Sequence, residues 1–253
     1  MNELEEYFKN NTGRQIHKWH HYFDIYERHF SRFRNKEVVV LEIGVAQGGS
    51  LQMWKRYLGD RAQIYGIDTN PQCKMLEEDN VHIIVGSQSD RKFLRQVVQQ
   101  IPPIDILIDD GGHTMKQQIA TFEELFGHIK DDGVYLCEDC HTSYWHEYGG
   151  GYKRHGSFIE YTKNWIDYVN AFHSKTPTLK VSEFTLHAQS IHYYDSIVVV
   201  EKSVKEKLMT SMTGTPSFER TPFTPNMRQK ITNRLRGIVT RSMRYVRGSL
   251  FRH

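Results

Sequence analysis

One stretch, VVVLEIGVAQGGS at residues 38–50, constrains the fold of this chain more than any other. A run of branched apolar residues contains the acid Glu42, and a turn of small residues that begins at Gly44 leads into a helical segment. Open α/β sheets build nucleotide sites from this order of strand, glycine turn and helix. The stretch therefore predicts a fold class and a class of ligand together.

Strands and helices alternate along most of the chain. Strands are expected at 37–43, 62–67, 81–85, 104–108 and 133–137, and helices at 50–58, after Pro71, and at 90–100, 114–129 and 157–172. Two further strands, near 183–188 and 190–200, have no helix between them and are expected to pair antiparallel. Aromatic residues at helical spacing predict a leading helix or helix pair over 15–34. This order predicts an α/β fold, a doubly wound and mostly parallel sheet with helices on both faces.

The distribution of charge divides the chain of 253 residues. Residues 228–253 carry eight Lys and Arg and no acid, although the net charge of the whole chain is only +3. We therefore expect a domain at 1–202 with a helical part at 1–35, a proline-containing linker at 203–227, and a basic amphipathic tail at 228–253. The tail favours contact with a membrane surface or a partner, and a disordered tail is an alternative of equal weight. No nucleic-acid partner is expected, because the body is acidic and carries no recognised motif.

The cellular compartment can be predicted from features that are missing from the sequence. It contains no apolar run long enough to span a bilayer, and MNELEEYFKN is too polar for a secretory signal. Its three cysteines have neither disulfide-scaffold nor zinc spacing. We expect a reduced, cytoplasmic setting, at the inner face of the membrane if the tail binds there.

Acids follow four of the five expected parallel strands, and ligands of doubly wound sheets bind at that edge. Glu42, Gly44 and Asp68 suit a nucleoside, with Asp68 placed to accept the two ribose hydroxyls. The glycine spacing is not G-x-G-x-x-G, so a nucleoside without a pyrophosphate fits better than NAD. Glycines needed only for packing are the alternative. In GSQSD, 86–90, Ser87 and Gln88 suit an adenine edge, and a helix cap by Ser89 is the simpler interpretation.

A second group of acids lies after the fourth and fifth strands. Asp110, Glu138 and Asp139 offer three carboxylates, which suit Mg²⁺ or a similar ion. His113 follows Asp110 across a Gly-Gly turn and suits a general base that takes a proton from a hydroxyl. Helix-capping acids and an ordinary loop histidine are the alternative.

Aromatic residues follow these acids. His141, Tyr144 and Trp145 precede three glycines at 149–151, and together they suit a lid with aromatic faces for a sugar or another planar apolar surface. An ordinary glycine loop with surface aromatics is the alternative interpretation.

Taken together, LEIGVAQGGSLQMW, GIDTNP, GSQSD, IDILIDDGGHT and EDCHTSYWHEYGGG resemble class I S-adenosylmethionine-dependent methyltransferases. More closely, they resemble the metal-dependent sugar O-methyltransferases of macrolide biosynthesis over residues 15–202. The resemblance implies a seven-stranded Rossmann-like sheet whose last strand is antiparallel. It implies contacts to S-adenosylmethionine from Glu42, Gly44, Ser50, Asp68, Ser87, Gln88 and Asp109, metal ligation by Asp110, Glu138 and Asp139, and His113 as the base.

The expected activity is a Mg²⁺-dependent O-methyl transfer to a sugar hydroxyl of a small glycoside, a glycolipid or a polysaccharide precursor. His141, Tyr144 and Trp145 are expected at the acceptor, and a weakly held homo-oligomer is expected. A metal-dependent hydroxylase or hydrolase on the same fold and a non-catalytic nucleoside-binding module are the alternatives, since fold does not fix function.

Overall fold

The computed structural model describes residues 2–206, 208–219, 226–229 and 231–232. It divides into the units Met1–Leu208 and Met209–His253, and everything below concerns the first unit unless stated otherwise. The strands are β1 Val39–Ile43, β2 Gln63–Asp68, β3 Val81–Val85, β4 Ile104–Asp109, β5 Ile129–Cys137, β6 Ala188–Tyr193 and β7 Val198–Lys202. The α-helices are α1 Glu3–Lys9, α2 Tyr22–Phe30, α3 Gly49–Leu58, α4 Arg91–Val97, α5 Met115–Leu125, α6 Phe158–Val169 and α7 Glu183–His187. Short 3₁₀ helices are η1 Ser31–Phe33, η2 Pro71–Leu76, η3 Phe126–His128, η4 Cys140–Tyr144, η5 His146–Tyr148 and η6 Ala171–His173.

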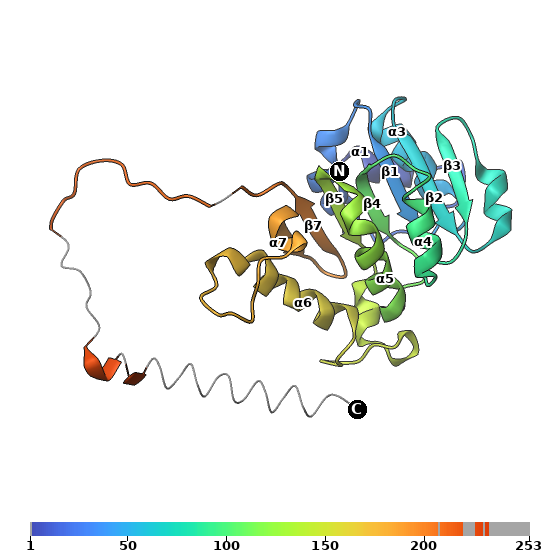
Figure 1. The fold of residues 1–253 in the computed structure, drawn as a ribbon. Coiled ribbons are helices and arrows are strands. Elements are labelled where there is room, and N and C mark those ends of the chain that lie inside the picture. Colours follow the sequence, from blue (N-terminus) through green and yellow to red (C-terminus); the bar gives the residue numbers. More distant parts are fainter. Residues whose placement is uncertain (1, 207, 220–225, 230, 233–253) are drawn as a thin grey trace. The chain divides into compact units, whose positions relative to one another are not determined.

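The seven strands form one sheet in the order β3-β2-β1-β4-β5-β7-β6 (Figure 1). Strands β1 to β5 pair parallel, and β7 is antiparallel to both of its neighbours, β5 and β6. The expected mostly parallel sheet with an antiparallel last strand is confirmed. The strand order reverses between β1 and β4, and the crevice at such a reversal is where doubly wound sheets bind ligands.

Helices cover both faces of the sheet. Along β1, Val40 packs into a core that also contains side chains of α1, α2 and α3, and Leu41 packs into the opposite core with α4, α5 and α6. All five residues of β1 are buried, as expected for a central strand of a two-sided sheet. The carboxyl ends of the central strands therefore form the part of the sheet that is open to a ligand.

Two glycines let distant segments approach the turn after β1. Gly44 has φ +94, and a Cβ there would lie 2.0 Å from the carbonyl oxygen of Asp110. A Cβ at Gly49, where α3 begins, would lie 2.4 Å from the carbonyl oxygen of Gln15. Because glycine has no Cβ, the loop after β4 and the N-terminal segment both close on this turn.

Some expected elements have different bounds. The helix over 15–34 is shorter, since α2 starts at Tyr22 and residues before it cross the site in irregular conformation. The strand expected near 183–188 is wrong: a capping box at Ser182 and Thr185 starts the helix α7 instead. The strand expected at 190–200 is two strands joined by a tight turn, in which the amide of Tyr194 donates to the carbonyl oxygen of Ile197.

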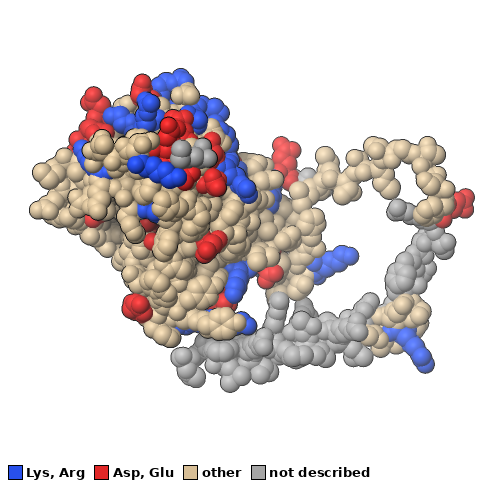
Figure 2. All heavy atoms as spheres, turned by 180° about the vertical axis from the view of Figure 1, so that it is seen from behind, with Lys and Arg blue, Asp and Glu red and all other residues tan. Residues whose placement is uncertain are grey.

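The surface of this unit carries charges of both signs. On the face seen in Figure 2, Lys and Arg side chains are interspersed with Asp and Glu side chains at one end, and most of the remaining surface carries neither. Among the described residues, no helix is both long and apolar enough to span a bilayer. The tail predicted at 228–253 lies mostly outside the described residues, and the linker predicted at 203–227 lies partly outside them.

Candidate functional site

A cavity of about 430 Å³ opens at the carboxyl ends of the central strands. On one side it is lined by the turn at 44–46 and by Asp68 and Thr69, here called the β1–β2 side. On the other it is lined by 110–113 and 138–139, here called the β4–β5 side. Residues 15–19 and Tyr22 close the mouth. The ends of neighbouring strands bring the predicted acids together, and the N-terminal segment adds Lys18 and Tyr22 to the lining.

On the β1–β2 side, Asp68 organises the turn after β1. One carboxylate oxygen accepts hydrogen bonds from the amides of Val45 and Ala46, both at 3.0 Å, and the other accepts from Asn70 at 2.8 Å. The two carboxylate oxygens offer about four lone-pair sites and these three amides use three of them, so Oδ1 of Asp68 can still accept a bond from a ligand in the cavity. The prediction that this acid meets a ribose is compatible with its position.

Glu42 lies beneath the same turn, fully buried. Its carboxylate accepts from the hydroxyl of Ser50 at 2.8 Å and from the indole nitrogen of Trp54 at 3.1 Å. Burial raises the pKa of Glu42 from 4.5 to about 7. Glu42 does not line the cavity, but its neighbours Ser50 and Lys18 do.

Gln88 lines the cavity, but its amide is bonded within the protein. The amide nitrogen donates to Asp109 at 2.5 Å and to Thr121 at 2.8 Å, and the amide oxygen accepts from the backbone of Gly112 at 3.1 Å. Gln88 therefore ties the end of β3 to the loop after β4. Burial raises the pKa of Asp109 to about 7, and neither Asp109 nor Ser87 lines the cavity.

The cap of α4 is not the one expected from the sequence. Asp90, rather than Ser89, accepts the hydrogen bonds of the first amides of α4, those of Lys92 and Phe93. A carboxylate accepts from two free amides at once and also interacts favourably with the N-terminal end of the helix dipole.

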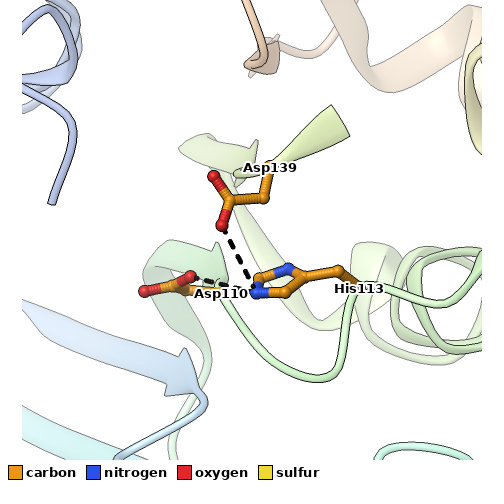
Figure 3. A group of neighbouring side chains, drawn as sticks. All are labelled: Asp110, His113 and Asp139. Atoms are coloured by element: carbon orange, nitrogen blue, oxygen red, sulfur yellow. Dashed lines mark ion pairs between the residues drawn. The ribbon is translucent and has the colours of Figure 1, made fainter. Parts of the chain in front are cut away.

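On the β4–β5 side, Asp110, His113 and Asp139 converge. One ligand atom from each lies within 4.8 Å of the others (Figure 3). His113 Nε2 is 3.7 Å from Asp110 Oδ1 and 3.5 Å from Asp139 Oδ2. Two carboxylates and one imidazole at this spacing can hold a divalent cation or a substrate hydroxyl between them.

Backbone geometry fixes this group. His113 and Asp139 both have positive φ, +54° and +52°, a region that non-glycine residues seldom occupy. The hydroxyl of Thr142 donates to the carbonyl oxygens of both residues at 2.9 Å and so ties the two loops together. Strained residues of this kind cluster at functional sites, because the surrounding structure must hold them.

Glu138 lines the cavity but is only 1% exposed and lies behind the converging group. The ammonium group of Lys18 donates to Glu138 Oε2 at 2.8 Å and to Asp110 Oδ2 at 2.5 Å, and lies 3.9 Å from Glu42 Oε1. Burial disfavours its charged form, but the three carboxylates hold the pKa of Lys18 well above its usual value. Lys18 is therefore a buried cation inside a carboxylate cluster.

Aromatic side chains surround the mouth next to Asp139. Ring centroids are 6.1 Å apart for Trp19 and His141, 4.7 Å for His141 and Trp145, and 5.8 Å for Trp145 and Tyr148. We call these four residues the aromatic rim. Trp19 is 50% exposed and Trp145 is 44% exposed, so both offer free ring surface. Tyr144, which is 52% exposed, lies in the same loop between His141 and Trp145.

Eight of the predicted site residues line the cavity, namely Gly44, Ser50, Asp68, Gln88, Asp110, His113, Glu138 and Asp139, but Lys18 and Trp19 were not predicted as site residues. Both belong to the segment 15–34, for which the sequence predicted a leading helix or helix pair. No local pattern marks Lys18, because it precedes α2 in irregular conformation. Only the folded chain shows that it meets the acids.

Comparison with known proteins gives this site a context. Residues 41–140 match a family model described as a methyltransferase domain. The 8-demethyl-8-alpha-L-rhamnosyl tetracenomycin-C 2'-O-methyltransferase of Streptomyces olivaceus is 36% identical over 73% of this chain and 51% of that protein. The mycinamicin VI 2''-O-methyltransferase of Micromonospora griseorubida is 34% identical over 70% of this chain and 47% of that protein. The chain thus spans about half the length of the curated relatives that it matches.

A solved structure supports the same relationship. The MycE methyltransferase of the mycinamycin biosynthetic pathway, in complex with Mg and SAH, matches with a TM-score of 0.75 and 30% identity over 88% of this chain and 58% of that chain. A second MycE structure contains Mg, SAH and mycinamycin VI and matches with a TM-score of 0.74. The resemblance drawn from the sequence motifs is confirmed.

Proposed function

Because the chain carries a class I methyltransferase domain similar to sugar O-methyltransferases, we propose that it transfers a methyl group from S-adenosylmethionine to a sugar hydroxyl, with Mg²⁺ or a similar cation. One observation carries the proposal furthest. A single cavity joins a β1–β2 side suited to a nucleoside with a β4–β5 side suited to a cation and a base. Neither side alone would distinguish a methyltransferase from a nucleoside-binding module.

The β1–β2 side would receive the methyl donor. Asp68 would accept the ribose hydroxyls, and the backbone of the turn from Gly44 would face the methionine part, with Ser50 at the start of α3. Gly86 and Gln88 line the far end of the cavity, where the adenine would lie. S-adenosylmethionine, when bound, supplies a methyl group on a positively charged sulfur.

The β4–β5 side fits a divalent cation. Asp110 and Asp139 each direct a carboxylate oxygen towards the same point, and Glu138 lines the cavity beside them. Hard oxygen ligands of this kind suit Mg²⁺, and the single positive charge of Lys18 offsets only part of the negative charge of the three acids. A cation held there would make a bound hydroxyl more acidic.

His113 would act as the general base. Its Nε2 points at the space between the two carboxylates, so a hydroxyl bound there lies within reach of it (Figure 3). His113 would take the hydroxyl proton on Nε2 while the oxygen forms a bond to the methyl carbon. The carbon–sulfur bond breaks as its electron pair returns to sulfur. The cavity contributes mainly by aligning the oxygen, the methyl carbon and the sulfur.

The acceptor would lie against the aromatic rim. Flat, exposed Trp and His rings beside a polar site suit the apolar face of a sugar ring or of its aglycone. Two relatives are named as O-methyltransferases of a rhamnosyl tetracenomycin-C and of mycinamicin VI. A small glycoside is therefore the first acceptor to test, and glycolipid and polysaccharide precursors are the wider prediction. A cytoplasmic location, a weakly held homo-oligomer and membrane contact through 228–253 stay predictions.

A methyl-transfer screen tests the proposal. The full chain is incubated with isotopically labelled S-adenosylmethionine, Mg²⁺ and a panel of rhamnosides, amino-sugar macrolides, sugar nucleotides and glycolipid precursors. Mass spectrometry should find a labelled methyl group on a sugar oxygen. EDTA should abolish the transfer, and added Mg²⁺ should restore it.

Three outcomes would contradict the proposal. Transfer that continues unchanged in EDTA would remove the role of the cation. Binding of S-adenosylmethionine without transfer to any acceptor would favour the nucleoside-binding module. Cleavage or hydroxylation of an acceptor without uptake of label would favour the hydrolase or hydroxylase.

A further inference from the structure

Three buried side chains of the N-terminal segment donate hydrogen bonds to the acids of the β4–β5 side. Lys18 bridges Asp110 Oδ2 and Glu138 Oε2, as described above. The hydroxyl of Tyr26 donates to the other oxygen of Glu138 at 2.8 Å. The hydroxyl of Tyr22 donates to Asp139 Oδ1 at 2.7 Å. All three acids, which come from the ends of two strands, are thus bonded by one short segment. We call Lys18, Tyr22 and Tyr26 the donor row.

The donor row determines which carboxylate oxygens remain for a cation. Lys18 occupies Oδ2 of Asp110, and Oδ1 of Asp110 faces His113 at 3.7 Å. Tyr22 occupies Oδ1 of Asp139, and Oδ2 of Asp139 faces His113 at 3.5 Å. Each aspartate is therefore bonded on one oxygen from behind and presents the other to the centre of the site.

The donor row is shielded from water, so its bonds are not exchanged for bonds to solvent. Tyr22 and Tyr26 are fully buried, and the Lys18 side chain is 2% exposed. Carboxylates that bind metals depend on such hydrogen bonds behind them, and loss of one typically costs 10–100-fold in metal affinity or activity.

We propose that Lys18, Tyr22 and Tyr26 are positioning residues of the divalent-cation site, which orient its carboxylates and thereby set its affinity for the cation. The inference rests on the proposed function insofar as that function places a cation at Asp110 and Asp139. It adds that the carboxylates at the cation site are oriented by a segment about 90 to 120 residues away in the sequence.

A purely structural role, attachment of α2 to the sheet, is the rival explanation. A second hydrogen bond of α2 makes it possible to distinguish the positioning role from the structural role. The hydroxyl of Tyr57 donates to Glu27 of α2 at 2.8 Å, away from the cavity. Tyr57→Phe therefore removes a phenol-to-carboxylate bond that attaches α2 without touching the site, and it is the matched control for Tyr22→Phe and Tyr26→Phe.

The test is calorimetric titration of the full chain with Mn²⁺ and with Mg²⁺, alongside thermal unfolding with and without the cation. We expect cation affinity to fall about 10-fold in Tyr22→Phe and Tyr26→Phe and up to about 100-fold in Lys18→Met. Tyr57→Phe should lower the unfolding temperature but bind the cation as the wild type does. The two phenylalanine variants carry the test if Lys18→Met fails to fold.

Three results would overturn the inference. Wild-type affinity in folded Tyr22→Phe and Tyr26→Phe would show that the donor row only attaches α2, as would an equal loss in Tyr57→Phe. Tighter binding in Lys18→Met would show that the ammonium competes with the cation. No cation binding by the wild type would defeat the cation part of the proposed function itself, and this inference with it.

Discussion

The two sides of the cavity are built in different ways. On the β1–β2 side, Asp68 bonds the turn at 44–46, and strands β1 and β2 are neighbours in both sequence and sheet. On the β4–β5 side, Asp110 and Glu138 are held by Lys18, which is 92 and 120 residues away from them in the sequence. The bonds of the β1–β2 side join neighbouring elements of the chain, and their donors are backbone amides. The β4–β5 side depends on buried charge that only the completed fold brings together.

This difference suggests that the two sides can be damaged separately. The β1–β2 side would respond to changes of its own turn, because the bonds of Asp68 begin and end within one β–α–β unit, β1, α3 and β2. The β4–β5 side would respond to changes in a distant segment, because a buried carboxylate needs a partner and that partner is Lys18. Four predictions test the separation, from the largest expected effect to the smallest.

His113→Gln should affect the chemical step alone. The variant keeps a polar side chain but cannot take up a proton, so kcat should fall about 10²–10⁴-fold. The affinity for S-adenosylmethionine, measured by calorimetry, should stay at the wild-type value because no bond on the β1–β2 side changes. His187→Gln, a histidine of α7 outside the cavity, is the control. If the affinity for S-adenosylmethionine fell by as much as kcat, the two sides of the cavity would not be separable.

Glu42→Gln should change how stability depends on pH. Burial raises the pKa of Glu42 from 4.5 to about 7, so between these values the folded protein holds a proton that the unfolded chain has lost. The wild-type free energy of unfolding should therefore fall as pH rises from about 4.5 to 7, by at most about 3 kcal/mol from this group. Denaturant unfolding should show a flatter profile for Glu42→Gln over this range. Identical profiles would mean that Lys18 keeps Glu42 ionised and couples the two sides.

Asp68→Asn should weaken binding of S-adenosylmethionine about 10- to 100-fold, because a hydrogen bond to a charged group contributes about 1.5–3 kcal/mol. The affinity for Mn²⁺ should not change. Asp90→Asn, which alters the cap of α4 outside the cavity, is the matched control. Calorimetry measures both affinities, and a parallel loss of Mn²⁺ binding would contradict two separable sides.

Trp19→Ala should raise the KM for the acceptor several-fold, since contact with an exposed aromatic ring is worth about 1 kcal/mol. Both the donor affinity and the cation affinity should stay unchanged. Tyr168→Ala removes a comparably exposed aromatic ring from α6, away from the cavity, and should leave the KM unchanged. An unaltered KM in Trp19→Ala would remove the aromatic rim from the acceptor site.

The difference between the two sides of the cavity also explains which parts of the fold and of the site could be predicted from the sequence. The strand at 39–43, the turn at Gly44 and the acids at strand ends follow from local patterns, because side-chain periodicity and glycine placement are local constraints. The capping box at Ser182 competed with an alternating pattern, and so a helix was mistaken for a strand. Lys18 could not be assigned, because a lysine among aromatic residues gives no local sign that three carboxylates will surround it. The direction of the Glu138 side chain likewise depends on Lys18 and Tyr26, which no local pattern connects to it.

Calorimetric titration of S-adenosylmethionine into the full chain tests the central claim, that one cavity joins a donor side and a cation side, most directly. We expect one molecule to bind per chain, with wild-type affinity in His113→Gln and at least tenfold weaker affinity in Asp68→Asn. No binding to the wild type, or equal binding by the wild type and Asp68→Asn, would contradict the account.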